Sequence, residues 1–86
     1  MKEAQHGLVS KIKILRVSPY PLVRFTLTRD EDELNCLINQ HALNFLYQVN
    51  DGDYLAAFGH TNKRKQFVIE KFAVQKLNQT EKVLQK

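Results

Sequence analysis

The chain has 86 residues, 43% hydrophobic and 26% charged, with thirteen Lys and Arg against nine Asp and Glu. This composition is typical of a soluble globular domain, and one domain of this size is too small to enclose an elaborate active site. No apolar stretch approaches the ~18 residues of a membrane span, and the first six residues lack the apolar segment of a signal peptide, so we expect a cytoplasmic protein without membrane contact.

The first half of the chain is expected to form three strands. Residues 8–17 mix hydrophobic residues with lysines, and Leu15 directly follows Ile14, which predicts a bulge because one extra residue swaps the two faces. Two prolines in residues 18–21 end this strand. Residues 23–28 show the clearest alternation, with one face formed by Val23, Phe25 and Leu27. A charged turn at 29–33 leads into a third strand at 34–38, with inward residues Leu34, Cys36 and Ile38.

The second half is expected to form one short helix and two strands. Asn39 is the expected N-cap of a helix of about ten residues, which Asn50-Asp51-Gly52 ends. Residues 53–59 form the fourth strand and 60–65 a polar, basic loop. Residues 67–77 form a fifth strand that bends near Lys71, because its apolar residues change parity there.

Three strands, a short helix and two strands are the element order of a five-stranded OB-fold barrel, a mainly all-β architecture with its helix between strands 3 and 4. We therefore expect a single OB-fold domain over residues 1–86. Its core spans about residues 7–77, with short tails at 1–6 and 78–86.

Several stretches resemble bacterial single-stranded DNA-binding proteins. Residues 23–29 (VRFTLTR) resemble their second strand, residues 42–55 (ALNFLYQVNDGDYL) resemble their helix and the turn into the fourth strand, and Leu8–Lys11 resembles the start of their first strand. Gly59 occupies the place of the glycine that closes the fourth strand. The resemblance implies single-stranded DNA binding in DNA replication and a homo-oligomer, either a dimer or a tetramer.

The sequence also departs from that family. It contains no Trp, whereas the family commonly stacks bases on Trp and Phe, and it ends in residues 81–86 (EKVLQK) instead of an acidic partner-recruiting tail. The short connection between the fourth and fifth strands resembles the primosomal replication protein of the same superfamily, whose loop lysines engage the DNA strand.

The charge is unevenly distributed along the chain. Residues 1–30 carry +4, residues 31–60 carry −5 and residues 61–86 carry +5, so basic segments flank an acidic one. Basic segments favour a polyanionic partner. The expected phosphate contacts are Lys11, Lys13, Arg24, Arg29, Lys63, Arg64 and Lys65. The aromatic residues expected to stack on bases are Tyr20, Tyr54, Phe58 and Phe67, although the alternation in their strands also suits core positions for Phe58 and Phe67.

These features predict a single-stranded DNA-binding protein with little sequence preference. A protein-interaction or assembly module and an RNA-binding OB protein are the alternatives. We expect no enzyme, cofactor or metal site: the three histidines are widely spaced, Asp51-Gly52-Asp53 lacks the further ligands of a calcium loop, and Cys36, the single cysteine, alternates with apolar residues as a buried side chain does.

Overall fold

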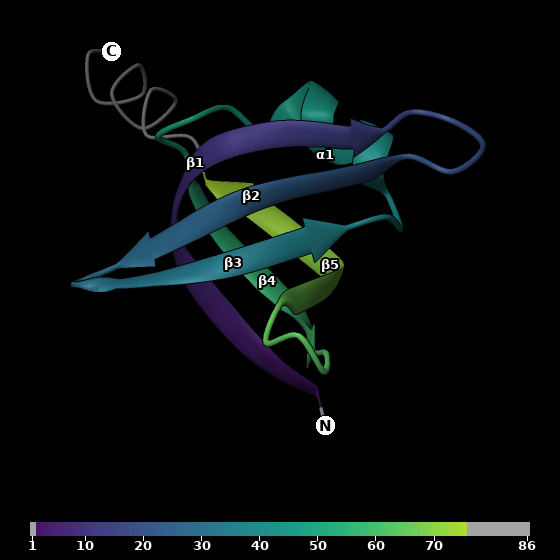
Figure 1. The fold of residues 1–86 in the computed structure, drawn as a ribbon. Helices are drawn as coiled ribbons and strands as arrows, with labels where there is room; N and C mark the ends of the chain where they lie inside the picture. The colour runs from purple at the N-terminus through teal and green to yellow at the C-terminus, as the bar shows by residue number, and fades with distance from the viewer. Residues whose placement is uncertain (1, 76–86) are drawn as a thin grey trace, which may run out of the picture.

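Five strands form a closed barrel in the spatial order β1-β2-β3-β5-β4 (Figure 1). The computed structural model describes residues 2–75. The elements in chain order are β1 (Lys2–Arg16), β2 (Leu22–Arg29), β3 (Asp32–Ile38), α1 (Ala42–Gln48), β4 (Tyr54–Thr61) and β5 (Phe67–Gln75). This is the OB-fold barrel that the element order predicts, with its one helix between β3 and β4. Residues 76 and 77 of the expected fifth strand and the expected tail at 78–86 lie outside the described residues.

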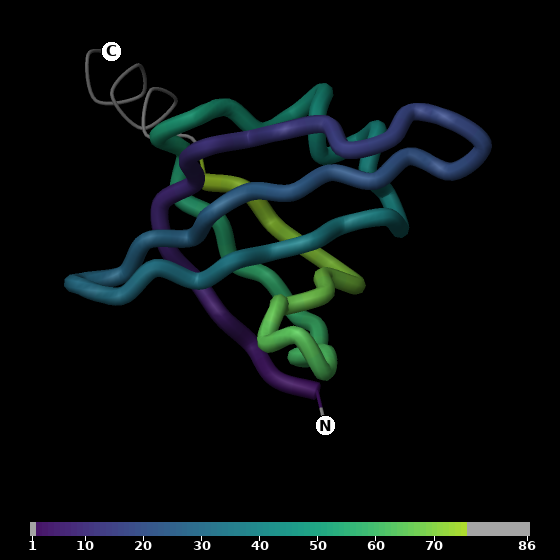
Figure 2. Tube along the Cα trace, viewed as in Figure 1, coloured from purple at the N-terminus to yellow at the C-terminus, as the bar shows by residue number. Residues whose placement is uncertain are grey.

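β1 curves around the barrel and closes it, as the trace in Figure 2 shows. Its second half pairs with β2, while residues 2–8 pair antiparallel with β4. β1 therefore starts at Lys2 rather than near Leu8. The early part shows no apolar alternation because its inward positions, Glu3 and Gln5, lie toward the open end of the barrel, where they stay exposed or half-buried.

Two bulged strands confirm the breaks in alternation. The β1–β2 register is irregular between Ile14 and Arg16, as predicted, and again between Ser10 and Lys13. In β5, Ile69 is opposite Gly59 while Lys71 is opposite Phe58, so one extra residue bends the strand where its parity changes.

The barrel core contains the inward residues expected for the second strand and two of the three expected for the third, Cys36 and Ile38. The largest buried side chains are Phe25, Phe45, Phe67, Leu27, Ile38, Leu55, Ile69, Val9, Val23 and Cys36. Phe45 of α1 stacks on Phe25 of β2, with ring centroids 4.6 Å apart. Since a buried aromatic pair contributes more than its area alone, this contact fixes α1 on the barrel. Leu34, expected in the core, is only half-buried at its edge.

α1 is shorter than expected and begins later. It has seven residues, its N-cap position is His41, and His41 adopts the left-handed conformation with φ 63°. The prediction of Asn39 as the N-cap was wrong. Its side-chain oxygen instead accepts a hydrogen bond from the backbone N–H of Gln40, at 2.6 Å, which forms a local turn before the helix. Within residues 2–75 no helix has the length and apolar character needed to cross a membrane.

Candidate nucleic-acid interface

A line of register partners crosses the outer surface of four strands. From β1 to β5 it consists of Lys13, Arg24, Leu37 and Val68. Directly opposed residues on neighbouring strands project from the same side of a sheet, so these side chains are neighbours. β5 starts beside Cys36 of β3, which brings the turn before β5 to the edge of this surface. We call the outer surface of β1, β2 and β3, together with the β1–β2 loop (17–21) and the β4–β5 turn (62–66), the basic face.

The β4–β5 turn presents three consecutive cations and is organised by Asn62. The Asn62 side-chain oxygen accepts hydrogen bonds from the backbone N–H groups of Arg64 (2.9 Å) and Gln66 (3.0 Å). The backbone N–H of Lys65 donates to the carbonyl of Asn62 at 3.0 Å, and Lys65 has φ 64°. This geometry is typical of a three-residue hairpin loop. The turn therefore holds Lys63, Arg64 and Lys65 at its exposed tip.

Five of the predicted phosphate contacts lie on the basic face and have no carboxylate partner among residues 2–75. They are Lys13, Arg24, Lys63, Arg64 and Lys65. Unpaired, exposed cations close together raise the local positive potential and attract a polyanion. The strand pairing thus brings predicted phosphate contacts from two distant parts of the chain onto one face.

Two other predicted phosphate contacts, Lys11 and Arg29, interact with side chains of the protein itself. Lys11 lies 3.9 Å from the carboxylate of Glu33, so part of its charge is balanced. Arg29 lies at the far end of β2, where its guanidinium donates to the side-chain carbonyl of Gln5. The charged β2–β3 turn follows it and projects at the left of Figure 1, away from the β4–β5 turn. Arg29 is therefore not part of the basic face.

The β1–β2 loop carries the one predicted stacking residue that the basic face includes. Tyr20 is 71% exposed. The Arg16 Nε donates a hydrogen bond to the backbone carbonyl of Tyr20 at 2.9 Å, which ties the loop to the end of β1. Sequence reasoning did not identify Arg16, although its position next to the expected loop was a usable signal. An exposed ring on a tethered loop suits stacking on an unpaired base.

The remaining predicted stacking residues lie elsewhere. Tyr54 and Phe58 project from the outside of β4, because Leu55 and Ala57, which alternate with them, are buried. Their register partners in β1 are Leu8 and Ala4, so neither ring belongs to the line of partners that starts at Lys13. Tyr54 also hydrogen-bonds His6. Phe67 has no exposed surface and belongs to the core, so its ring offers no face to a base.

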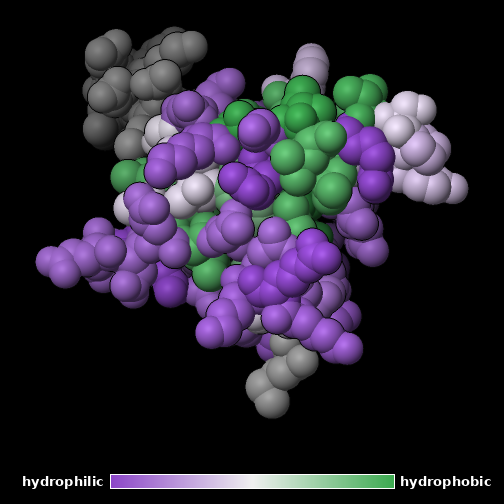
Figure 3. Space-filling model, viewed as in Figure 1, coloured by the Kyte–Doolittle hydropathy of each residue, from purple (hydrophilic) through white to green (hydrophobic). Residues whose placement is uncertain are grey.

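The surface of the basic face is divided in polarity. Figure 3 shows hydrophilic side chains over its lower part, around the β4–β5 turn, and hydrophobic ones in its upper part, toward the β1–β2 loop. Exposed apolar residues near that loop are Ile14 (51%), Leu15 (44%) and Val17 (69%). The arrangement offers cations at one end for phosphates, and apolar surface with Tyr20 at the other for bases.

The described residues include neither a reactive thiol nor a cluster of metal ligands. Burial raises the pKa of the Cys36 thiol to about 12, so it is protonated at neutral pH and is not a nucleophile. Among residues 2–75 no group of three or more potential metal ligands is present. Glu70 hydrogen-bonds Lys2 (2.8 Å) and His60 (3.0 Å), and these bonds lower the pKa of its carboxyl. This cluster joins β1, β4 and β5 on the exterior of the barrel.

Comparison with known proteins supports the fold. No protein-family model matches the sequence, and no curated protein matches it. Among solved structures, the chain is similar to the crystal structure of the mitochondrial single-stranded DNA-binding protein Rim1 from S. cerevisiae. The TM-score is 0.74 at 14% sequence identity, over 88% of this chain and 94% of that one. The two proteins share the OB fold.

Proposed function

We propose that this protein binds single-stranded DNA through the basic face. The observation that carries the proposal is the group of five cations without carboxylate partners that the barrel brings together. OB-fold barrels bind oligonucleotides on the face of strands 2 and 3, between the loops that join strands 1 to 2 and 4 to 5. The basic face occupies this location, and the fold that it shares with Rim1 agrees with the proposal.

Binding through this face has little sequence preference. Contacts to phosphates fix the position of a nucleic acid but read no sequence, and stacking accepts any base. A flexible single strand can follow the curved surface and place its bases on Tyr20, whereas the bases of a duplex are already stacked on one another. We therefore expect a preference for single strands over duplexes.

Fluorescence polarisation with labelled oligonucleotides tests the proposal. The full chain is titrated against oligo-dT, duplex DNA of the same length and the corresponding RNA, between 50 and 200 mM salt. We expect oligo-dT to bind most tightly and its affinity to fall steeply with salt. Absence of oligo-dT binding at 50 mM salt would refute the proposed function, and tighter binding of RNA would assign the face to RNA. A role in DNA replication stays a prediction.

A second surface favours self-association. On the outer side of β1, β4 and β5, a shallow hollow of about 290 Å³ has a lining of four alanines, the exposed ring of Phe58, Lys71 and Phe72. Small side chains let another sheet approach closely, and Phe58 supplies a protruding apolar group. We propose that two copies of the chain associate through this face, which would form the homo-oligomer that the sequence resemblance implies.

Sedimentation equilibrium tests this assembly independently of DNA binding. The variant Phe58→Glu places a charge on the face and should convert oligomer to monomer, whereas Tyr47→Glu, at a 92% exposed position on α1, should not. A wild-type chain that remains monomeric at every concentration would contradict the assembly and leave the DNA-binding proposal standing.

A further inference from the structure

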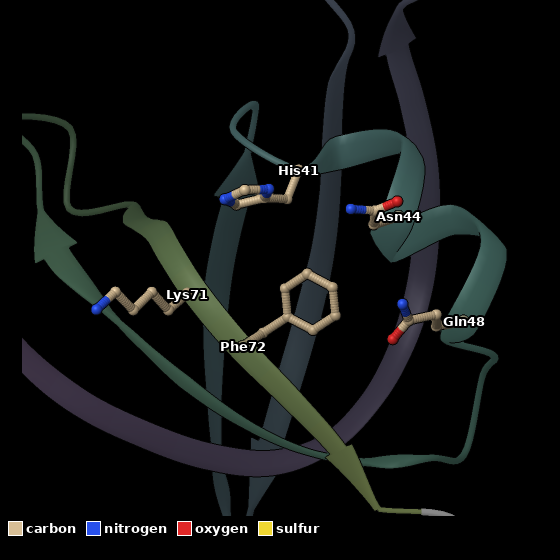
Figure 4. A pocket seen from close by; sticks show the side chains of 5 residues that line it. All are labelled: His41, Asn44, Gln48, Lys71 and Phe72. Atoms are coloured by element: carbon tan, nitrogen blue, oxygen red, sulfur yellow. The ribbon is translucent and has the colours of Figure 1, made fainter.

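A hollow of about 380 Å³ lies between α1 and β5. It is lined by His41, Asn44, Gln48, Lys71 and Phe72 (Figure 4). In the view of Figure 4 the ring of Phe72 lies in the middle, and the polar side chains surround it. The volume is within the range of small-molecule sites in proteins, about 300–1,000 Å³. None of these residues belongs to the basic face, and two of them, Lys71 and Phe72, also line the hollow on the outer side of β1, β4 and β5.

An extra residue in β5 and two polar residues on α1 produce this hollow. The extra residue in β5 changes the parity of the strand, so that Phe72 is opposite the buried Ala57 and turns toward α1. There its ring packs edge-on against Phe45, with centroids 5.6 Å apart. α1 presents Asn44 and Gln48, four residues apart and therefore on one side of the helix, instead of apolar residues that would cover the Phe72 ring.

The polar groups around the hollow are free to bind a ligand. Within residues 2–75 the side chains of His41, Asn44, Gln48 and Lys71 make no hydrogen bond or ion pair.

We propose that this hollow receives one unstacked base of a bound single strand. The inference rests on the proposed function and names a second contact for the same ligand. The Phe72 ring offers a surface for stacking, and each carboxamide offers both a donor and an acceptor, as the edges of nucleobases do. Lys71 supplies a cation for an adjacent phosphate.

The position of the hollow fits a strand that leaves the basic face. β5 runs from the β4–β5 turn, past Val68 at the edge of that face, to Lys71 and Phe72. β3 and β5 pair only from Cys36 to Ile38, after which β3 ends and the chain continues into α1. A single strand that crosses β3 onto β5 therefore meets the hollow next.

NMR titration of the full chain with mononucleotides tests the pocket. The probes are 5′-dAMP and 5′-dTMP, with deoxyribose 5-phosphate and inorganic phosphate as ligands without a base. We expect the side-chain amide resonances of Asn44 and Gln48 to shift with the nucleotides only. Absence of shifts with both nucleotides, or equal shifts with deoxyribose 5-phosphate, would overturn base recognition.

Oligonucleotide binding by paired variants gives a second readout. The double variant Asn44→Ala and Gln48→Ala removes both carboxamides at exposed helix positions, where Ala favours the helix. The matched control is Gln40→Ala with Asn50→Ala, two exposed carboxamides that flank α1 outside the hollow. We expect the first pair to weaken oligo-dT binding about ten-fold and the control less than two-fold.

The outcomes separate this inference from the proposed function. If the wild-type chain binds oligo-dT and the Asn44/Gln48 variant binds it equally well, the pocket assignment is wrong while the basic face remains. If the wild-type chain binds no single strand, the proposed function itself fails. Selective binding of a base-free sugar to the same residues would assign the hollow to a carbohydrate instead.

Discussion

Neutralising the β4–β5 turn is the most direct perturbation of the basic face. The triple variant Lys63→Ala, Arg64→Ala and Lys65→Ala removes three of the five predicted phosphate contacts on that face that lack carboxylate partners. The hydrogen bonds that build the turn come from Asn62 and from backbone groups, so the fold should survive the substitution. We therefore expect an electrostatic effect with little loss of stability, which a thermal melt checks.

The magnitude follows from counterion release. Each phosphate neutralised on a single strand contributes about −0.7 to the slope of log K against log salt, so five contacts give roughly −3.5 and the remaining two roughly −1.4. Between 50 and 200 mM salt, the affinity of the wild-type chain for oligo-dT should then fall roughly 130-fold, and that of the triple variant roughly 7-fold. Fluorescence polarisation at four or more salt concentrations measures both slopes.

A charge-matched control separates local contact from net charge. The triple variant lowers the net charge from +4 to +1. The control Asp30→Asn, Glu31→Gln and Asp32→Asn, in the β2–β3 turn and at the first residue of β3, raises it to +7. We expect the control to change the slope by less than about 0.7, because no phosphate contact is added or lost. If the triple variant keeps the wild-type slope, or if the control shifts it by a similar amount in the opposite direction, the assignment of the turn is refuted.

Three further predictions concern single positions. Tyr20→Ala should weaken oligo-dT binding by about 1–3 kcal/mol in a polarisation titration, and Tyr47→Ala should leave it unchanged. Gly59→Ala should destabilise the fold by about 3 kcal/mol in urea unfolding, because the new Cβ would lie 1.9 Å from the carbonyl oxygen of Val68; unaltered stability would contradict this packing. The partners of Glu70 lower its pKa from the ordinary 4.5, so its stabilising contribution is complete above that pH and is lost as pH falls through the lowered value. In thermal melts, the melting temperature of the Glu70→Gln variant should therefore fall less than that of the wild-type chain as the pH is lowered below 5.

Local patterns in the sequence were sufficient to predict the elements and their order. The alternation of Val23, Phe25 and Leu27 predicts that their face of β2 forms part of the core. The structure confirms this, because all three side chains are completely buried. The parity change near Lys71 likewise predicts the irregularity of β5, because side chains alternate along any strand. These properties depend on neighbours in the chain, so a single sequence contains them.

Patterns with two readings could not be decided in this way. In β4 the residues Tyr54, Ala56 and Phe58 alternate with Leu55 and Ala57, and both sets are apolar. Only closure of the barrel by β1 places Leu55 and Ala57 inside and leaves the other set on the exterior. The prediction that Tyr54 and Phe58 stack on bases therefore could not distinguish the outer side of β4 from the basic face.

The composition of the basic face and of the α1–β5 hollow depends on tertiary structure. Lys13 and Arg24 share a face with the β4–β5 turn because β3 pairs with both β2 and β5, segments far apart in the chain. Phe72 meets α1 because one extra residue in β5 turns its ring toward the helix. The sequence by itself determined which residues are cationic, aromatic or apolar and which elements they form. Strand register and barrel closure decided which of them share a surface, because those pairings join residues that no local pattern relates.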